Sequence, residues 1–122
     1  MSESFLRNNL QASIELKQRL LSDEALSKTL AQIADKMIAT FKSDGKVLFC
    51  GNGGSAADAQ HLSAELTGRY YFDRPALFAE ALHINTSYLT AVSNDHSFDH
   101  VYERLIDGIG RPNDILIGLS TS

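Results

Sequence analysis

The chain has 122 residues, a length that fits one domain, and its 43% hydrophobic and 21% charged content excludes an intrinsically disordered class. Its net charge of −4 argues against non-specific nucleic-acid binding, which needs a basic surface, and no apolar run is long enough for a membrane span. The single cysteine, Cys50, excludes an intrachain disulfide. With no signal pattern at the N-terminus, these features predict a soluble, cytoplasmic protein.

Residues 1–45 predict two amphipathic helices ahead of the rest of the chain. Apolar residues recur at helical spacing in both segments: Leu6, Leu10 and Ile14, then Leu26, Leu30, Ile33, Met37 and Phe41. Ser22 is the expected N-cap of the second helix, and Gly45 is its expected stop.

From residue 46 onward, short apolar runs alternate with helical patterns. We expect strands at 46–50, 78–84 and 114–119, and helices at 56–67, at 86–93 and after a cap at Ser97. This alternation predicts an α/β fold with a doubly wound parallel sheet. The chain stops directly after the third strand, where such a fold would enter its next helix, so we expect it to be the N-terminal part of a longer protein.

The segment Gly51-Asn52-Gly53-Gly54-Ser55 joins the first strand to its helix, at the edge of the sheet where α/β proteins bind ligands. Its glycines let main-chain amides approach an anion, and Ser55 with Asp58 is expected to form a capping box on the helix. Ser120, Thr121 and Ser122 follow the third strand in the same way. Both loops predict a phosphate site; a glycine turn and an N-cap without ligand are the alternatives.

Two further pairs of polar residues are candidates for chemistry at that edge. His61 and Glu65 stand four residues apart on one helix face, where they suit a divalent metal or a catalytic carboxylate, and equally a surface ion pair. Asn94 and Asp95 end the short helix after the second strand and are expected at the same edge, or simply to terminate the helix.

Three blocks of sequence carry a resemblance to a known family: Cys-Gly-Asn-Gly-Gly-Ser at 50–55, Asp-Ala-Gln-His at 58–61 and Glu-Leu-Thr-Gly-Arg-Tyr at 65–70. The chain resembles the sedoheptulose 7-phosphate isomerase (phosphoheptose isomerase) family. The resemblance continues through 74–75, 94–95 and 114–122, and it is weakest over 78–88. It implies the sugar isomerase (SIS) domain, with residues 46–122 as its N-terminal part and the C-terminal part missing.

The resemblance also implies roles for individual residues. Glu65 would be the acid–base carboxylate, and His61 with Glu65 would bind zinc, one ion per subunit. The other zinc ligands, a glutamine and a histidine, would lie beyond this chain. The residues implied to bind substrate are Asn52, Gly53, Gly54, Ser55, Glu65, Asn94, Asp95, Ser120, Thr121 and Ser122.

The implied activity is the aldose–ketose isomerisation of sedoheptulose 7-phosphate to D-glycero-D-manno-heptose 7-phosphate, for the lipopolysaccharide heptose of the bacterial surface. The implied assembly is a homotetramer in which residues 1–45 contribute to the interface. Two alternatives stay open: SIS domains also serve as sugar-phosphate sensors or protein-binding scaffolds, and residues 1–122 alone can be inactive. Glu65 favours the enzyme, because the scaffold relatives lack the catalytic glutamate.

Overall fold

The structure is a computed structural model that describes residues 3–121. The chain divides between Lys36 and Met37 into two compact units, which are described separately below. No helix within the described residues is long and apolar enough to cross a bilayer.

The N-terminal unit contains α1 (Glu3–Leu21) and the first turns of α2 (Glu24–Lys42), so the prediction of two helices is confirmed. The predicted N-cap is wrong by one residue. The Asp23 carboxylate accepts the N–H of Leu26 at 2.9 Å, whereas the Ser22 hydroxyl donates to the Gln18 carbonyl at the end of α1. A carboxylate also suits the positive end of the α2 dipole.

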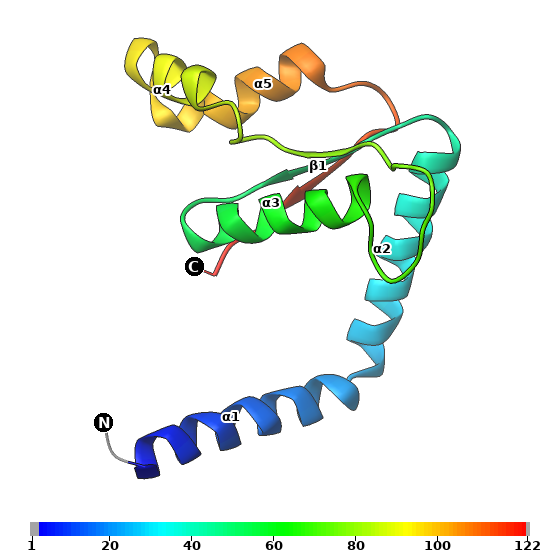
Figure 1. Ribbon diagram of the computed structural model, residues 1–122, viewed down its shortest axis with the longest axis vertical. Helices are drawn as coiled ribbons and strands as arrows, with labels where there is room; N and C mark the ends of the chain where they lie inside the picture. The colour runs from blue at the N-terminus through cyan, green and yellow to red at the C-terminus, as the bar shows by residue number, and fades with distance from the viewer. Residues whose placement is uncertain (1–2, 122) are drawn as a thin grey trace. The chain divides into compact units, whose positions relative to one another are not determined.

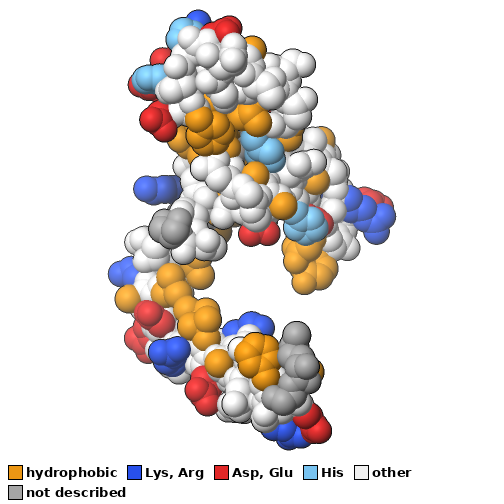
Figure 2. Space-filling model, turned by 90° about the vertical axis from the view of Figure 1, so that its left-hand side faces the viewer, with side chains coloured by type: hydrophobic (Ala, Val, Ile, Leu, Met, Phe, Trp, Pro, Cys, Tyr) orange, Lys and Arg blue, Asp and Glu red, His pale blue; other side chains and the backbone are white. Residues whose placement is uncertain are grey.

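The apolar faces of these helices lie on the surface. No side chain of α1 is buried, and Leu10 and Leu30 are 67% and 57% exposed. Figure 2 shows hydrophobic side chains, in orange, along the helices of this unit. An amphipathic helix gains most of its stability by burying such a face, so these faces are candidates for contact with another chain.

The second unit is built on a parallel sheet in the order β2-β1-β3, which confirms the predicted α/β fold. The strands are β1 (Val47–Cys50), β2 (Ala79–Ala81) and β3 (Ile115–Gly118), and Val47 pairs with both Ala79 and Ile115. The central strand β1 is the core: Val47, Leu48 and Phe49 are at most 2% exposed. The edge strand β3 is less buried than its apolar sequence suggests: the Leu116 side chain is 52% exposed.

Helices cover the two faces of β1 (Figure 1). The helix α3 (Gly54–Thr67) packs on β1 and β2 through its buried residue Ala59, in one cluster with Val47 and Phe49. The opposite side carries α4 (Thr86–Asp95), η1 (Phe98–His100) and α5 (Val101–Ile109), and Leu48 and Ile106 line one pocket there. This arrangement leaves the carboxyl ends of β1 and β3 at one edge.

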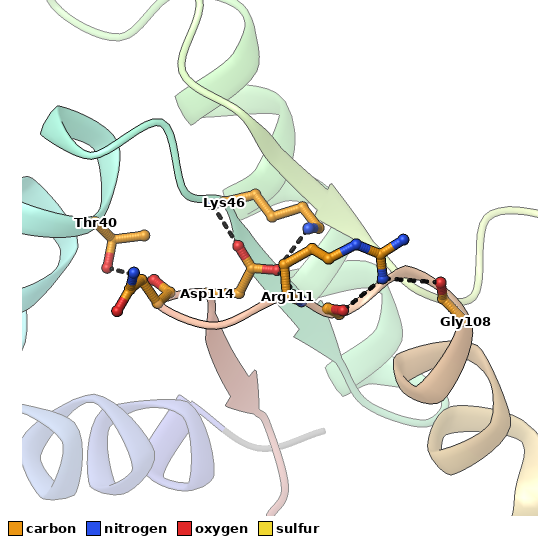
Figure 3. Close-up of polar contacts among 7 residues, drawn as sticks. Thr40, Lys46, Gly108, Arg111 and Asp114 are labelled. Carbon is orange, nitrogen blue, oxygen red and sulfur yellow. Dashed lines mark hydrogen bonds and ion pairs between the residues drawn. The ribbon is translucent and has the colours of Figure 1, made fainter.

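The opposite ends of β1 and β3 are joined by a buried ion pair between Lys46 and Asp114 (Figure 3). Their side chains are 11% and 9% exposed. The Asp114 carboxylate also accepts the N–H groups of Lys46 at 3.0 Å and Arg111 at 2.7 Å. Burial alone would raise the pKa of Asp114, but these hydrogen bonds and the Lys46 charge leave that pKa below its usual value.

Two helix ends differ from the sequence prediction. The helix α2 ends at Lys42, and Asp44 rather than Gly45 takes the left-handed conformation, with φ of 58°. Gly45 closes the turn by donating its N–H to the Thr40 carbonyl at 2.9 Å. Ser97 precedes η1 as predicted, but its hydroxyl makes no capping hydrogen bond among the described residues.

Candidate functional site

A pocket of about 430 Å³ lies at the carboxyl edge of the sheet, between the loops that leave β1 and β3. The strands pair in parallel up to Cys50 and Gly118, so their following loops emerge side by side. The lining residues are Cys50, Gly51, Asn52, Ser55, Tyr102, Gly118, Leu119, Ser120 and Thr121. The predicted proximity of the two loops is therefore observed; Ser122 lies outside the described residues.

The three glycines of the first loop have different structural roles. A Cβ on Gly51 would lie 2.7 Å from the Ser55 main chain, so this glycine permits a close approach of loop and helix. Gly53 has φ of 56°, a left-handed value that a residue with a Cβ rarely adopts. A Cβ on Gly54 would meet no atom within 4 Å. Open space therefore lies beside the first residue of α3.

The capping box predicted for this helix is wrong. The helix α3 begins at Gly54 with Gly53 as its N-cap, and no side chain within the described residues caps it. Ser55 is already inside the first turn, where its N–H donates to the Asn52 carbonyl at 3.0 Å. The Ser55 main chain lies close to Gly51, and Ser55 lines the pocket. Among the described residues, no side chain hydrogen-bonds to the N-terminus of α3, where an anion could do so.

Tyr102, on α5, is a lining residue that the sequence analysis missed. Its hydroxyl donates to the Gly51 carbonyl at 2.6 Å and lies 3.3 Å from the Asn52 Oδ1. Its ring meets Phe98 edge-on, with 6.4 Å between the ring centroids. Burial raises the pKa of the Tyr102 phenol, so the hydroxyl stays protonated at neutral pH. No motif marks this residue, because Tyr102 and Gly51 are 51 positions apart.

His61 and Glu65 share one face of α3, as their spacing predicts. The His61 Nε2 and the Glu65 Oε1 are 3.6 Å apart, and the two side chains are 75% and 32% exposed. Glu65 does not line the pocket between the two loops. This geometry is therefore compatible with a metal-binding or catalytic role for the pair, and equally with a simple surface ion pair.

The contacts of Arg74 with the end of α3 also escaped the sequence analysis. Arg74 donates from Nη2 to the Glu65 carbonyl at 2.9 Å and from Nη1 to the Leu66 carbonyl at 2.7 Å. Its guanidinium thus satisfies carbonyl groups in the last turn of α3, which lack partners inside the helix. Arg74 fixes the main chain of the turn that carries Glu65.

The described residues do not form a complete metal site. No group of three or more His, Cys, Asp or Glu side chains among them lies close enough to hold a metal ion. His61 and Glu65 supply two potential ligands, whereas a zinc site needs three or four protein ligands.

Asn94 and Asp95 end α4, as predicted, and the Asn94 Nδ2 donates to the Asp95 Oδ1 at 3.1 Å. Neither residue lines the pocket between the two loops, and the same holds for Gly53 and Gly54. Their contact with a substrate stays a prediction.

The comparison with known proteins decides the family. The sequence matches the SIS domain over residues 10–122. The chain belongs to the SIS domain family. Among curated members, it is 52% identical over 110 residues to the phosphoheptose isomerase of Mycobacterium tuberculosis, covering 90% of this chain and 56% of that protein. It is 48% identical over 122 residues to the phosphoheptose isomerase of Akkermansia muciniphila, covering 100% of this chain and 62% of that protein.

Solved structures of SIS-domain relatives agree. The phosphoheptose isomerase from Neisseria gonorrhoeae superposes with a TM-score of 0.88 at 42% identity, covering 98% of this chain and 61% of that chain. The phosphoheptose isomerase from Francisella tularensis gives a TM-score of 0.85 at 32% identity, covering 100% and 63%. The chain spans 56% to 62% of the length of the curated relatives described above.

Proposed function

We propose that this chain carries the sugar-phosphate-binding half of a phosphoheptose isomerase, which converts sedoheptulose 7-phosphate to D-glycero-D-manno-heptose 7-phosphate. The observation that carries the proposal is the pocket between Gly51–Ser55 and Ser120–Thr121, in a chain 52% identical to a phosphoheptose isomerase. Both loops leave the carboxyl edge of the sheet, where α/β proteins bind their ligands.

The phosphate would bind between the hydroxyl-rich loop after β3 and the start of α3. Ser55, Ser120 and Thr121 offer hydroxyl groups on the pocket wall. The N-terminus of α3 adds its dipole, because Ser55 in the first turn of this helix lines the pocket. Binding at the phosphate supplies energy that positions the distant reacting carbons.

Glu65 is the proposed acid–base group. It would remove a proton from C1 of the ketose, forming the cis-enediol, and return a proton to C2 to give the aldose. A second proton would move from the oxygen on C1 to the oxygen on C2, so that the overall charge is unchanged. One carboxylate can serve both carbons, since bonded carbons lie only about 1.5 Å apart. Arg74 would hold the turn that carries Glu65 in place.

The wider setting of the enzyme follows from the same proposal. His61 and Glu65 would supply two of the zinc ligands. The exposed apolar faces of α1 and α2 would pack in a homotetramer. The enzyme would work in the cytoplasm, in the synthesis of heptose for the bacterial surface.

The test is turnover of sedoheptulose 7-phosphate by the full-length gene product and its Glu65→Gln variant. The expected result is turnover by the wild type, and a loss of more than ~100-fold in kcat with retained substrate binding in the variant. Glu103→Gln is the matched control, because Glu103 also pairs with a histidine, His100 Nδ1 at 2.9 Å, and does not line the pocket. Near-normal turnover by Glu65→Gln would eliminate the role of Glu65. Binding without turnover by the wild type would indicate a sugar-phosphate sensor instead.

A further inference from the structure

We propose that Tyr102 is a positioning residue for the phosphate loop: its hydroxyl holds the Gly51–Asn52 peptide in the orientation that admits an anion. The inference rests on the proposed function, because it concerns the same pocket. It assigns a role to a residue of α5, which lies outside both loops.

The Tyr102 hydroxyl holds the first peptide of the loop. The ladder between β1 and β3 ends at the pair Cys50 and Gly118, with the Leu119 N–H donating to the Cys50 carbonyl at 2.8 Å. Gly51 follows directly and is buried, so its carbonyl needs a partner. Tyr102 provides that partner at 2.6 Å.

The direction of this carbonyl matters for an anion. In a trans peptide the C=O of Gly51 and the N–H of Asn52 point in opposite directions within one plane. While the carbonyl faces Tyr102, the Asn52 N–H faces away from it. A flip of this peptide would turn the carbonyl oxygen the other way, where its negative end would repel a phosphate.

The Tyr102 phenol has one proton, which the closer Gly51 carbonyl accepts, so the contact of this hydroxyl with the Asn52 side chain is secondary. The Asn52 Oδ1 lies 3.3 Å from the Tyr102 hydroxyl, so the amide nitrogen of that side chain points away from the phenol. This nitrogen is a pure donor and suits a phosphate or sugar oxygen. Tyr102 therefore acts on the loop mainly through the main-chain peptide between Gly51 and Asn52.

The phenol is itself held firmly enough for this task. The Tyr102 ring meets the Phe98 ring edge-on, at an interplanar angle of 78°. Burial raises the pKa of the phenol, which keeps the donor proton in place across the neutral range.

The variant Tyr102→Phe keeps the ring and removes only the hydroxyl. Tyr88→Phe is its matched control, because the Tyr88 hydroxyl also donates to a main-chain carbonyl, that of Val101 at 2.9 Å, but does not line the pocket. Both variants should melt within a few degrees of each other, since each loses one comparable hydrogen bond. Tyr102→Phe alone should raise the KM for sedoheptulose 7-phosphate and the Kd for inorganic phosphate by ~3- to 10-fold, with kcat nearly unchanged.

Amide NMR spectra of both variants complete the test. Tyr102→Phe should shift the amide resonances of Asn52, Gly53 and Gly54, and Tyr88→Phe should leave them in place. If the wild type binds phosphate but shows no turnover, the proposed function fails, and weaker phosphate binding confined to Tyr102→Phe still supports the positioning role. Equal phosphate affinity and unchanged loop resonances in Tyr102→Phe would overturn the inference.

Discussion

Arg74 donates a hydrogen bond from its Nη2 to the main-chain carbonyl of Glu65, with 2.9 Å between the two atoms. A second bond, from Nη1 to the Leu66 carbonyl, spans 2.7 Å. The planar guanidinium matches two neighbouring carbonyls at a helix end, and its charge complements the negative end of the α3 dipole. The loop after α3 thus stabilises the turn that presents the candidate catalytic carboxylate.

The substitution Arg74→Lys should lower both stability and turnover, although it keeps the charge. A single ammonium cannot donate to both carbonyls in the same fork geometry, so we expect a loss of about 1–2 kcal/mol in the free energy of unfolding. Turnover should fall more than substrate affinity, because Glu65 moves relative to the reacting carbons. Urea unfolding and steady-state kinetics measure both effects. Arg7→Lys, at a 79% exposed ion pair, should change neither; equal behaviour of the two variants would contradict the role of Arg74.

The ion pair at the other end of the sheet predicts a pH-dependent stability. Asp114→Asn leaves the Lys46 ammonium buried without its counter-charge and should cost about 3 kcal/mol near neutral pH. The pKa of Asp114 is lower in the folded protein than in the unfolded chain, so its contribution is complete above the unfolded value. As the pH falls through the lower, folded value, this contribution disappears.

The difference in unfolding free energy between wild type and Asp114→Asn should therefore shrink in acid. Urea titrations at several pH values measure it. Asp73→Asn is the control, because Asp73 is 86% exposed in its pair with Arg69 and should cost less than about 1 kcal/mol at any pH. A difference that stays constant down to strongly acidic pH would show that the Asp114 charge contributes no stability.

The glycines of the loop predict opposite effects for two similar substitutions. Gly51→Ala places a Cβ 2.7 Å from the Ser55 main chain and should destabilise the fold by about 1–3 kcal/mol. Gly54→Ala meets no atom within 4 Å and should leave the thermal midpoint unchanged or slightly raised. If Gly54 contacts the substrate, its variant should bind inorganic phosphate more weakly despite its intact fold. Calorimetry measures both quantities, and unchanged affinity in Gly54→Ala would count against that contact.

Alkylation of Cys50 provides a chemical probe of the pocket, because this residue lines it. Burial raises the pKa of its thiol, so iodoacetamide should react with it more slowly at neutral pH than with a free thiol such as glutathione. The onset of fast alkylation should move to higher pH. Since Cys50 lines the pocket and is the only cysteine of the chain, sedoheptulose 7-phosphate should slow its alkylation. Mass spectrometry follows the reaction, and a rate insensitive to the sugar phosphate would place the ligand elsewhere.

The parts of the site that depend on local sequence were predictable. The apolar run at Val47–Cys50 predicts a strand, the glycines after it predict a turn, and α3 follows from the helical pattern after Ser55. The parallel order of elements then places the loops after β1 and β3 at one edge. The details of helix capping were less predictable, because Ser22, Asp23 and Ser55 have similar capping tendencies and only backbone geometry selects among them.

The sequence by itself therefore determined the α/β order of elements, the glycine-rich loop at Gly51–Ser55 and the His61–Glu65 spacing. Only the tertiary structure decided what supports them. Tyr102 meets Gly51 across 51 positions, and Asp114 meets Lys46 across 68. Such contacts leave no periodic trace in the chain, because they depend on strand register and on how the helices pack against the sheet.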